Sequence, residues 1–328
     1  MVVQNSKKSG KELTLDLSIV IVNWNTKDMT RDCLASVRAG LGSLAAEVIV
    51  IDNSSSDGSA DMIATEFPEF ILIRNSENRG FAAANNQGFE VAHGRHVLLL
   101  NTDTLIHGIV LPASVAWLDT HSEVGAMGCR VLNTDGSVQL TCSMYPSILN
   151  QLLQLFGFSK FSYPQFFGRY IMKHWLRDSE KEVEVISGCY LLVRRDVISQ
   201  VGQLDESFFF FGEETDWCKR MRDAGWHLMF APVGEITHHG SISARKLNHL
   251  RDVMLSEAIV RLHRKHSGLI GGLLAFGVII MFNATRALYW SLATVFAESE
   301  HARERGRHFR AVLAASNRIW PKSVGTIV

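Results

Sequence analysis

The chain has 328 residues, 47% of them hydrophobic and 20% charged, which is typical of a folded protein with one large domain and an appendage. Its 33 basic and 33 acidic residues give a formal net charge of zero, so bulk charge gives no support to a nucleic-acid partner. The five cysteines are scattered without C-x-x-C spacing. Neither a disulfide framework nor a zinc site is expected, and a reducing cytoplasmic location fits best.

Short apolar runs alternate with amphipathic segments over the first hundred residues. We predict strands at residues 17–22, 47–51, 70–74 and 96–100, and helices at residues 27–39, 56–67 and 80–93. This alternation is typical of βαβ units and predicts an α/β fold with a Rossmann-like, mostly parallel sheet flanked by helices. Residues 1–14 are polar, and we expect a flexible tail there rather than a secretory signal.

Polar residues follow all four predicted strands. They are Asn23-Trp24-Asn25, Asp52-Asn53, Asn78-Arg79-Gly80 and Asn101-Thr102-Asp103. In parallel sheets ligands bind beyond the carboxyl ends of the strands. One such loop alone would be explained as a turn, but four together predict a ligand site at this edge.

The loop Asn101-Thr102-Asp103 suits a metal ion. Mg²⁺ and Mn²⁺ prefer oxygen ligands and keep substrate phosphates in their shell, so Asp103 is a candidate ligand. The alternative is that Asp103 caps a helix beginning near Ile106. His238 could complete the metal shell, although a lone histidine is usually structural.

Two other loops suit a nucleotide. The carboxylate of Asp52 and the amide of Asn53 can read the edge of a pyrimidine base. The segment Asn78-Arg79-Gly80 leads into an alanine-rich helix, whose N-terminus together with Arg79 favours a phosphate. The alternative is that these small residues only let the helix pack closely on the sheet.

Residues 145–182 are rich in aromatic side chains. We expect an insertion over the active face or a membrane-contacting surface, with core filling as the alternative. A strand is predicted at residues 183–193, broken at Ser187-Gly188, and helices at residues 197–201 and 216–224.

The densest acidic site is Glu213-Glu214-Thr215-Asp216, which follows four phenylalanines. Burial and mutual repulsion would raise some of these pKa values, as suits a general base that takes a proton from a hydroxyl. The alternative is a helix N-terminus stabilised by acids, which fits Asp216 best.

The C-terminal region contains a basic run at residues 261–266 and two apolar stretches at residues 269–282 and 287–296. Neither stretch alone spans a bilayer, and Arg286 lies close to the break between them. We predict two in-plane or hairpin helices on the membrane, with the basic run facing anionic lipid. The alternative is a helical pair packed on the catalytic domain or at a homo-oligomer interface.

Three segments, at residues 18–25, 50–58 and 77–88, together resemble glycosyltransferase family 2, especially its rhamnosyltransferase-type bacterial members. The resemblance covers roughly residues 15–245 and implies a GT-A-type fold, an inverting mechanism and a divalent metal, Mg²⁺ or Mn²⁺. It places a DxD-like metal motif on residues 101–103, the contact with the nucleotide base on Asp52 and the catalytic acids on residues 213–216. Glu214 stands where the family usually has Asp, so either Glu213 or Glu214 could be the general base.

On this basis we assign four groups of site residues. The catalytic group is Glu214, Glu213 and Asp216. The donor group is Val22, Asn23, Asn25, Asp52, Asn53, Asn78, Arg79, Gly80, Asn85, Asn101, Thr102 and Asp103. The acceptor group is Ser187, Gly188 and Trp217, and the metal ligands are Asp103 and His238.

The expected domains are a tail (1–14), a catalytic domain (15–250) and a helical, membrane-associated region (251–328). The catalytic domain divides into a nucleotide-sugar half (15–105) and an acceptor half (106–250). The resemblance implies transfer from dTDP-rhamnose, or alternatively a UDP-hexose, to a glycan or polyprenyl-diphosphate-linked acceptor of the bacterial cell envelope. The expected location is the cytoplasmic face of the inner membrane.

Two other classes of protein fit the sequence less well. A dinucleotide-dependent oxidoreductase needs G-x-G-x-x-G after the first strand, where this chain has Asn23-Trp24-Asn25, and a nucleotidyltransferase would also show a glycine-rich, basic loop there. A non-catalytic carbohydrate-binding scaffold is the second rival, and the acids at residues 213–216 argue against it.

Overall fold

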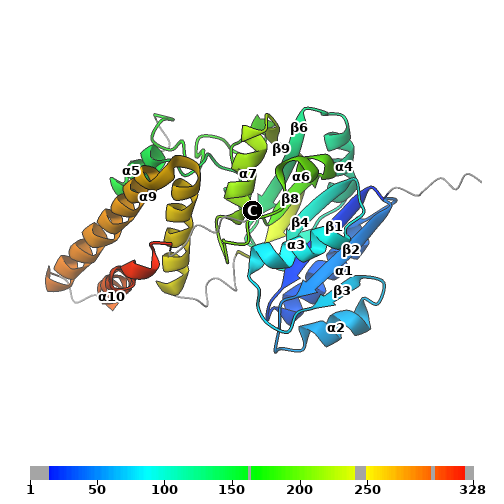
Figure 1. Ribbon diagram of the computed structural model, residues 1–328, viewed down its shortest axis with the longest axis horizontal. Helices are drawn as coiled ribbons and strands as arrows, with labels where there is room; N and C mark the ends of the chain where they lie inside the picture. The colour runs from blue at the N-terminus through cyan, green and yellow to red at the C-terminus, as the bar shows by residue number, and fades with distance from the viewer. Residues whose placement is uncertain (1–14, 162–163, 241–248, 297–299, 322–328) are drawn as a thin grey trace, which may run out of the picture.

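The computed structural model describes residues 15–161, 164–240, 249–296 and 300–321, so the predicted tail lies outside the described residues (Figure 1). Its centre is a mixed, mostly parallel sheet. In the described residues the sheet has nine strands in the order β3-β2-β1-β4-β8-β6-β9-β5, with β7 paired to β9. The four N-terminal strands, which are parallel as predicted, are β1 (Leu17–Asn23), β2 (Ala46–Asp52), β3 (Ile71–Arg74) and β4 (His96–Asn101).

The strands of the second half of the chain are β5 (Thr104–Ile106), β6 (Val124–Leu132), β7 (Lys181–Glu182), β8 (Tyr190–Arg194) and β9 (His227–His238). Two predictions are corrected here. Only the end of the predicted strand 183–193 belongs to β8, and its first part makes an isolated bridge between Ser143 and Val185. The helix expected near Ile106 is strand β5 instead, so Asp103 caps no helix.

Helices cover both faces of the sheet (Figure 1). One face carries α1 (Lys27–Gly40), α2 (Ser59–Glu66) and α4 (Val110–Asp119), and the other carries α3 (Phe81–Val91), α6 (Arg195–Val201) and α7 (Glu213–Asp223). The two cores follow from the period of two in a strand: Ile19 and Ile21 of β1 face the first set, and Val20 faces the second. Burial on both faces explains why these strands are continuously apolar.

The C-terminal region differs from the prediction of two helices separated at residues 283–286, because its two helical halves meet at Gly268 instead. Helix α9 (His249–Phe296) kinks at Gly268, where φ is 69°, and then continues through the predicted break at residues 283–286. The polar groups there are satisfied locally, because Asn283 and Thr285 donate to the carbonyls of Ile279 and Met281, each 2.9 Å away. By length and composition, this helix could cross a membrane.

The second half of α9 has two different faces. One face packs against α10 (Glu300–Ala314) in a small core that includes Ala275, Ile279 and Val312. The other face exposes a stripe of large apolar side chains, which are Leu269, Ile270, Leu273, Leu274, Met281, Leu288, Tyr289, Leu292 and Val295. We call this set the apolar stripe. The helix η2 (Ser316–Arg318) follows α10.

One part of the aromatic segment 145–182 fills the core and another part is exposed on the surface; the sequence had offered these as alternatives. Trp175 fills the core, where its ring meets Phe230 edge to face at 4.8 Å. By contrast, four phenylalanines around α5 (Ile148–Leu155) and η1 (Phe158–Lys160) are exposed, at positions 156, 158, 161 and 166. Helix α5 lies beside α9, and Arg286 donates to the carbonyl of Gln154 (Figure 1). The segment therefore adds apolar surface next to the stripe.

Close packing of α3 on the sheet gives the first prediction. A Cβ at Gly88 would lie 2.4 Å from Val20 Cγ1 and 3.1 Å from Ile51 Cδ1. We expect Gly88→Ala to lower the free energy of unfolding by about 1–3 kcal/mol through overpacking. Gly277→Ala is the matched control, because nothing lies within 4 Å of its added Cβ, and it should be neutral or stabilising. Chemical denaturation measures both; equal stability of Gly88→Ala and wild type would contradict the packing described.

Candidate active site at the carboxyl edge of the sheet

The loops after β1 and β2 are joined through Asn23. Its amide nitrogen donates to Asp52 Oδ1 at 2.7 Å, and its Oδ1 accepts from the hydroxyls of Thr26 and Thr30. The second oxygen of Asp52 accepts from the backbone of Ser55 at 3.0 Å. Asn23 is completely buried and holds the Asp52 carboxylate in place, while its expected contact with the donor stays a prediction.

Asn53 organises the loop after β3 in the same way. Its amide donates to Asn78 Oδ1 at 2.8 Å, and its Oδ1 accepts from Asn75 and from the backbone of Arg79. Asn78 Oδ1 also accepts from the backbone of Gly80. The side-chain amides of Asn53 and Asn78 therefore stabilise the loop. The side chain of Arg79 is exposed at the sheet edge.

Gly80 and Asn85 belong to the beginning of α3. Gly80 has φ of 84°, and a Cβ there would lie 2.6 Å from the carbonyl oxygen of Phe209, which accepts from the backbone of Phe81. Asn85 is buried and donates to the carbonyl of Phe81 in its own helix. The expected donor contact of Asn85 stays a prediction. The glycine is required by the close approach of the segment that carries Phe209.

The remaining donor residues lie around the ends of β1 and β4. Val22 is half-buried and pairs in register with Asn101. Asn25 is also half-buried, and its Oδ1 accepts from the backbone of Ser56. Thr102 is buried, with its hydroxyl 3.0 Å from that of Thr26, so it ties the loops together.

Asp103 and His238 meet at this edge because β5 pairs with β9, which sets Thr104 opposite His238. Asp103 Oδ1 lies 3.2 Å from His238 Nε2, and Asn101 Nδ2 lies 3.5 Å from the same nitrogen. His238 Nδ1 is 2.7 Å from Gln139 Oε1, while the Gln139 amide nitrogen donates to Asn133. Gln139 was not foreseen from the sequence; it fixes the ring so that Nε2 faces Asp103.

The pair fits a divalent cation. With its Nδ1 proton directed at Gln139, His238 presents the Nε2 lone pair toward the Asp103 carboxylate, which is the arrangement of two ligands of one ion. Within the described ranges no three His, Cys, Asp or Glu residues gather as a metal site. Two protein ligands suit Mg²⁺ or Mn²⁺, which take further ligands from substrate phosphates and water.

Glu213 and Glu214 begin helix α7 and form a carboxyl pair. Their side chains hydrogen-bond to each other, and the Oε2 atom of each is buried without a partner among the described residues. Burial, and then the charge of Glu214, raises the pKa of Glu213 well above its usual range. Burial also raises the pKa of Glu214, while the hydrogen bond from Glu213 lowers it. The geometry therefore favours a proton on Glu213 and a charge on Glu214, which is half-buried.

Asp216 has a structural environment instead. It is completely buried and bonds to Arg220, Lys265 and His266 at 2.7–2.8 Å. Burial alone would raise the pKa of Asp216, but the His266 hydrogen bond and the charges of Arg220 and Lys265 lower it to about 2. The bonds to Lys265 and His266 join α7 to α9, and the expected catalytic function of Asp216 stays a prediction.

The predicted acceptor residues are divided by the structure. Trp217 is completely buried: its ring stacks on Phe89 and its indole nitrogen donates to the carbonyl of Gly202 at 2.8 Å. The indole thus serves the packing of α7 on α3, and the expected acceptor contact of Trp217 stays a prediction. Gly188 is buried against Phe81, and Ser187 is half-buried.

The metal pair and the acid pair lie close to each other. Burial raises the pKa of Cys189 to about 12, and the charges of both Asp103 and Glu214 act on it. Burial and the charge of Glu214 also raise the pKa of Tyr170, which brings the aromatic segment to the acids. The carboxylates of Asp103 and Glu214 therefore both lie within electrostatic range of Cys189.

The sequence is similar to those of known glycosyltransferases. The N-acetylglucosaminyl-diphospho-decaprenol L-rhamnosyltransferase of Mycobacterium tuberculosis is 29% identical over 242 residues, covering 68% of this chain and 76% of that protein. The low-salt glycan biosynthesis hexosyltransferase Agl10 of Haloferax volcanii is 24% identical over 255 residues, covering 76% of each.

Solved structures show the same fold. The mannosyltransferase PcManGT from Pyrobaculum calidifontis, in complex with GDP-Man and Mn²⁺, has a TM-score of 0.56 at 15% identity, covering 96% of this chain and 92% of that one. GalNAc-T7 with UDP, GalNAc and Mn²⁺ has a TM-score of 0.53 at 16% identity, covering 92% and 56%. The sequence profile of Glycosyl transferase family 2 matches residues 18–202, more than half of the chain. The chain therefore belongs to glycosyl transferase family 2 and is a nucleotide-sugar glycosyltransferase with a GT-A-type fold.

Proposed function

We propose that this enzyme is an inverting, metal-dependent glycosyltransferase of bacterial cell-envelope polysaccharide synthesis, with a glycan or polyprenyl-diphosphate-linked acceptor. The observation that carries the proposal is the proximity of two sites at one sheet edge: the Asp103–His238 pair and the Glu213–Glu214 carboxyl pair. The first suits a metal-bound diphosphate, and the second suits proton removal from an acceptor hydroxyl.

On the donor side, Asp103 and His238 would hold Mg²⁺ or Mn²⁺. When bound, the ion neutralises negative charge on the leaving nucleoside diphosphate. The exposed Arg79 is placed to bind diphosphate oxygens. The free lone pairs of the Asp52 carboxylate, which Asn23 and Ser55 hold in a fixed orientation, can accept from a pyrimidine base.

On the acceptor side, Glu214 takes the proton of the acceptor hydroxyl. The hydroxyl oxygen then bonds to the anomeric carbon as the bond from that carbon to the diphosphate oxygen breaks. Glu213 keeps its own proton and donates it in a hydrogen bond to Glu214, which holds the base ionised and oriented. A single displacement from the opposite side inverts the anomeric centre.

We propose rhamnose from dTDP-rhamnose as the donor. The support is the L-rhamnosyltransferase of Mycobacterium tuberculosis, which is 29% identical to this chain. A UDP-hexose is the alternative, supported by the hexosyltransferase of Haloferax volcanii at 24% identity. A panel of nucleotide sugars, tested for hydrolysis and binding with Mn²⁺ or Mg²⁺, separates these donors and also the non-catalytic scaffold.

We further propose that α9 lies in the plane of a membrane, on the cytoplasmic face of the inner membrane. A spanning orientation is disfavoured because α10 packs along the second half of α9 and exposes Arg303, Arg305 and Arg307, whose charges would enter the hydrocarbon. The expected lipid contact of the basic run 261–266 is corrected. Arg261 pairs with Glu257, His263 is buried and Lys265 pairs with Asp216.

The first test of the proposal concerns the metal. We expect Asp103→Asn, or removal of divalent ions by EDTA, to abolish metal-linked binding of the nucleotide sugar in calorimetry, because Asp103 is the one carboxylate of the pair. Asp196→Asn, at an exposed position of α6, is the matched control and should bind like wild type. Donor affinity that is the same with and without metal would exclude the metal-dependent mechanism.

The second test concerns the base. Glu214→Gln should retain donor binding and lower the transfer rate roughly 10²–10⁴-fold, the usual loss for a general base. Rates are measured in a transfer assay with the donor that the panel identifies. Full activity in Glu214→Gln, with loss in Glu213→Gln, would assign the base to Glu213 instead.

The third test uses the raised pKa of Glu213. Folded Glu213 keeps its proton to a higher pH than the unfolded chain, whose carboxyl titrates near 4.5, so wild-type stability falls as pH rises above that value. Gln does not ionise, so Glu213→Gln should raise the melting temperature more at pH 8 than at pH 5. The control is Glu90→Gln, at an exposed position. An equal effect at both pH values would argue against a buried, protonated Glu213.

The fourth test concerns the membrane. Placing charges in the apolar stripe, as in Ile270→Glu with Leu274→Glu, should reduce co-sedimentation with vesicles of phosphatidylethanolamine and phosphatidylglycerol, because the stripe would be the buried face. Ala314→Glu adds a charge at an exposed position of α10 and should leave binding nearly unchanged. A wild-type protein that ignores such vesicles would overturn the proposal.

A further inference from the structure

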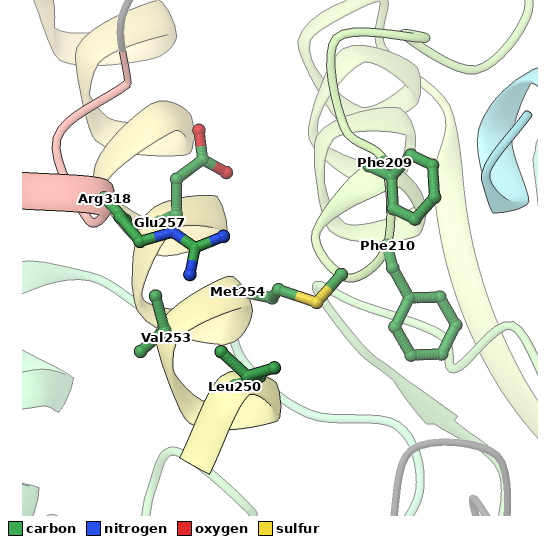
Figure 2. Close-up of a pocket in the computed structure, with 7 residues that line it drawn as sticks. All are labelled: Phe209, Phe210, Leu250, Val253, Met254, Glu257 and Arg318. Atoms are coloured by element: carbon green, nitrogen blue, oxygen red, sulfur yellow. The ribbon is translucent and has the colours of Figure 1, made fainter. Parts of the chain in front are cut away.

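A cavity of about 250 Å³ lies between the first half of α9 and the loop that leads into α7 (Figure 2). Its lining is mainly apolar and consists of Phe209, Phe210, Leu250, Val253, Met254, Glu257 and Arg318. Figure 2 shows the two phenylalanines on one side and the α9 residues on the other, with the Arg318 guanidinium beside Glu257. The cavity therefore combines an apolar interior with one exposed cation at its margin.

The walls of this cavity are fixed to each other. Phe208 packs in a buried cluster with Ala258 and Leu262 of α9. Just beyond, Lys265 pairs with Asp205 at 2.6 Å and with Asp216 at 2.8 Å. Removing one partner from such a buried ion network is strongly destabilising, so the two walls keep their spacing. The cavity is a built feature of the interface between α9 and the catalytic domain.

The loop that forms one wall also borders the active site. The carbonyl of Phe209 accepts from the backbone of Phe81, and its ring lies against Gly80. Phe210 meets Phe81 edge to face at 6.4 Å, three residues before Glu213. The wall residues Phe209 and Phe210 thus contact Gly80 in the proposed donor loop and Phe81 at the beginning of α3.

We propose that this cavity binds the first isoprene units of a polyprenyl-diphosphate-linked acceptor, with Arg318 bound to its diphosphate. The inference rests on the proposed function and adds the position of the lipid part. The occupant follows from the lining: aromatic and aliphatic side chains suit a prenyl chain, while the guanidinium suits an adjacent diphosphate. The charge of Glu257 repels the diphosphate only in part, because Arg261 Nε donates to the Glu257 carboxylate at 2.9 Å.

Farnesyl diphosphate is the probe for the experiment, since it joins a short prenyl chain to a diphosphate. Calorimetry in metal-free buffer compares it with inorganic diphosphate and with farnesol, using the full chain. We expect farnesyl diphosphate to bind more tightly than either fragment. Met254→Trp, which fills the cavity, and Arg318→Gln, which removes the cation, should each weaken binding roughly tenfold or more.

Leu255→Trp is the matched control, because Leu255 is exposed on the same helix and does not line the cavity. It should bind farnesyl diphosphate like wild type. Arg318 is exposed, so Arg318→Gln keeps the test decisive even if Met254→Trp misfolds. Three results would each overturn the proposal. The first is unchanged binding of farnesyl diphosphate by Arg318→Gln, and the second is wild-type binding of farnesyl diphosphate no tighter than that of inorganic diphosphate. The third is loss of farnesyl diphosphate binding in Asp103→Asn instead.

Donor hydrolysis is measured separately on the same variants. We expect Met254→Trp and Leu255→Trp to hydrolyse the nucleotide sugar at the wild-type rate, because neither residue lines the donor loops. Absence of donor hydrolysis in the wild type would contradict the proposed function while leaving the prenyl-binding result as it stands. The two failures are therefore distinguishable.

Discussion

Register in the parallel part of the sheet is the constraint on which the site depends. Asn23 pairs with Asp52 and Val22 with Asn101, so strands β1, β2 and β4 end at one level and the loops that follow them begin side by side. The buried bond from Asn23 to Asp52 then locks two of these loops together. A shift of one residue in any of these strands would turn its core side chains to the opposite face, so the same apolar pattern that forms the core also fixes the position of the polar ends.

The hydrogen-bond and ion-pair partners of each acid in α7 determine its pKa. Burial raises the pKa values of Glu213 and Glu214, whereas Asp216, one turn on, bonds to Arg220, Lys265 and His266, which lower its pKa to about 2. The same kind of side chain thus has a raised pKa at the beginning of the helix, as suits the proposed base, and forms a structural anchor inside the helix. The anchor joins α7 to α9, so the helix that carries the proposed membrane surface also positions the proposed base.

The sequence predicted the features that depend on local pattern. The four N-terminal strands, their polar ends and the acids of α7 follow from periodicity and motif, and the family resemblance gave the GT-A-type fold, whereas β5, β6, β7 and β9 were not predicted. Contacts between distant segments were not predictable: Gln139 reaches His238 across 99 residues, and Lys265 reaches Asp216 across 49. The break predicted at Asn283 was wrong because a polar side chain that bonds its own helix leaves the helix intact.

The most direct test of the account is a crystal structure of the protein with a nucleoside diphosphate and Mn²⁺. Anomalous scattering should place the ion between Asp103 Oδ1 and His238 Nε2, in contact with the diphosphate and on the same side of the sheet edge as Glu214. An ion bound elsewhere, or a diphosphate bound away from Asp103 without any ion, would contradict the central claim that this edge is a metal-dependent donor site.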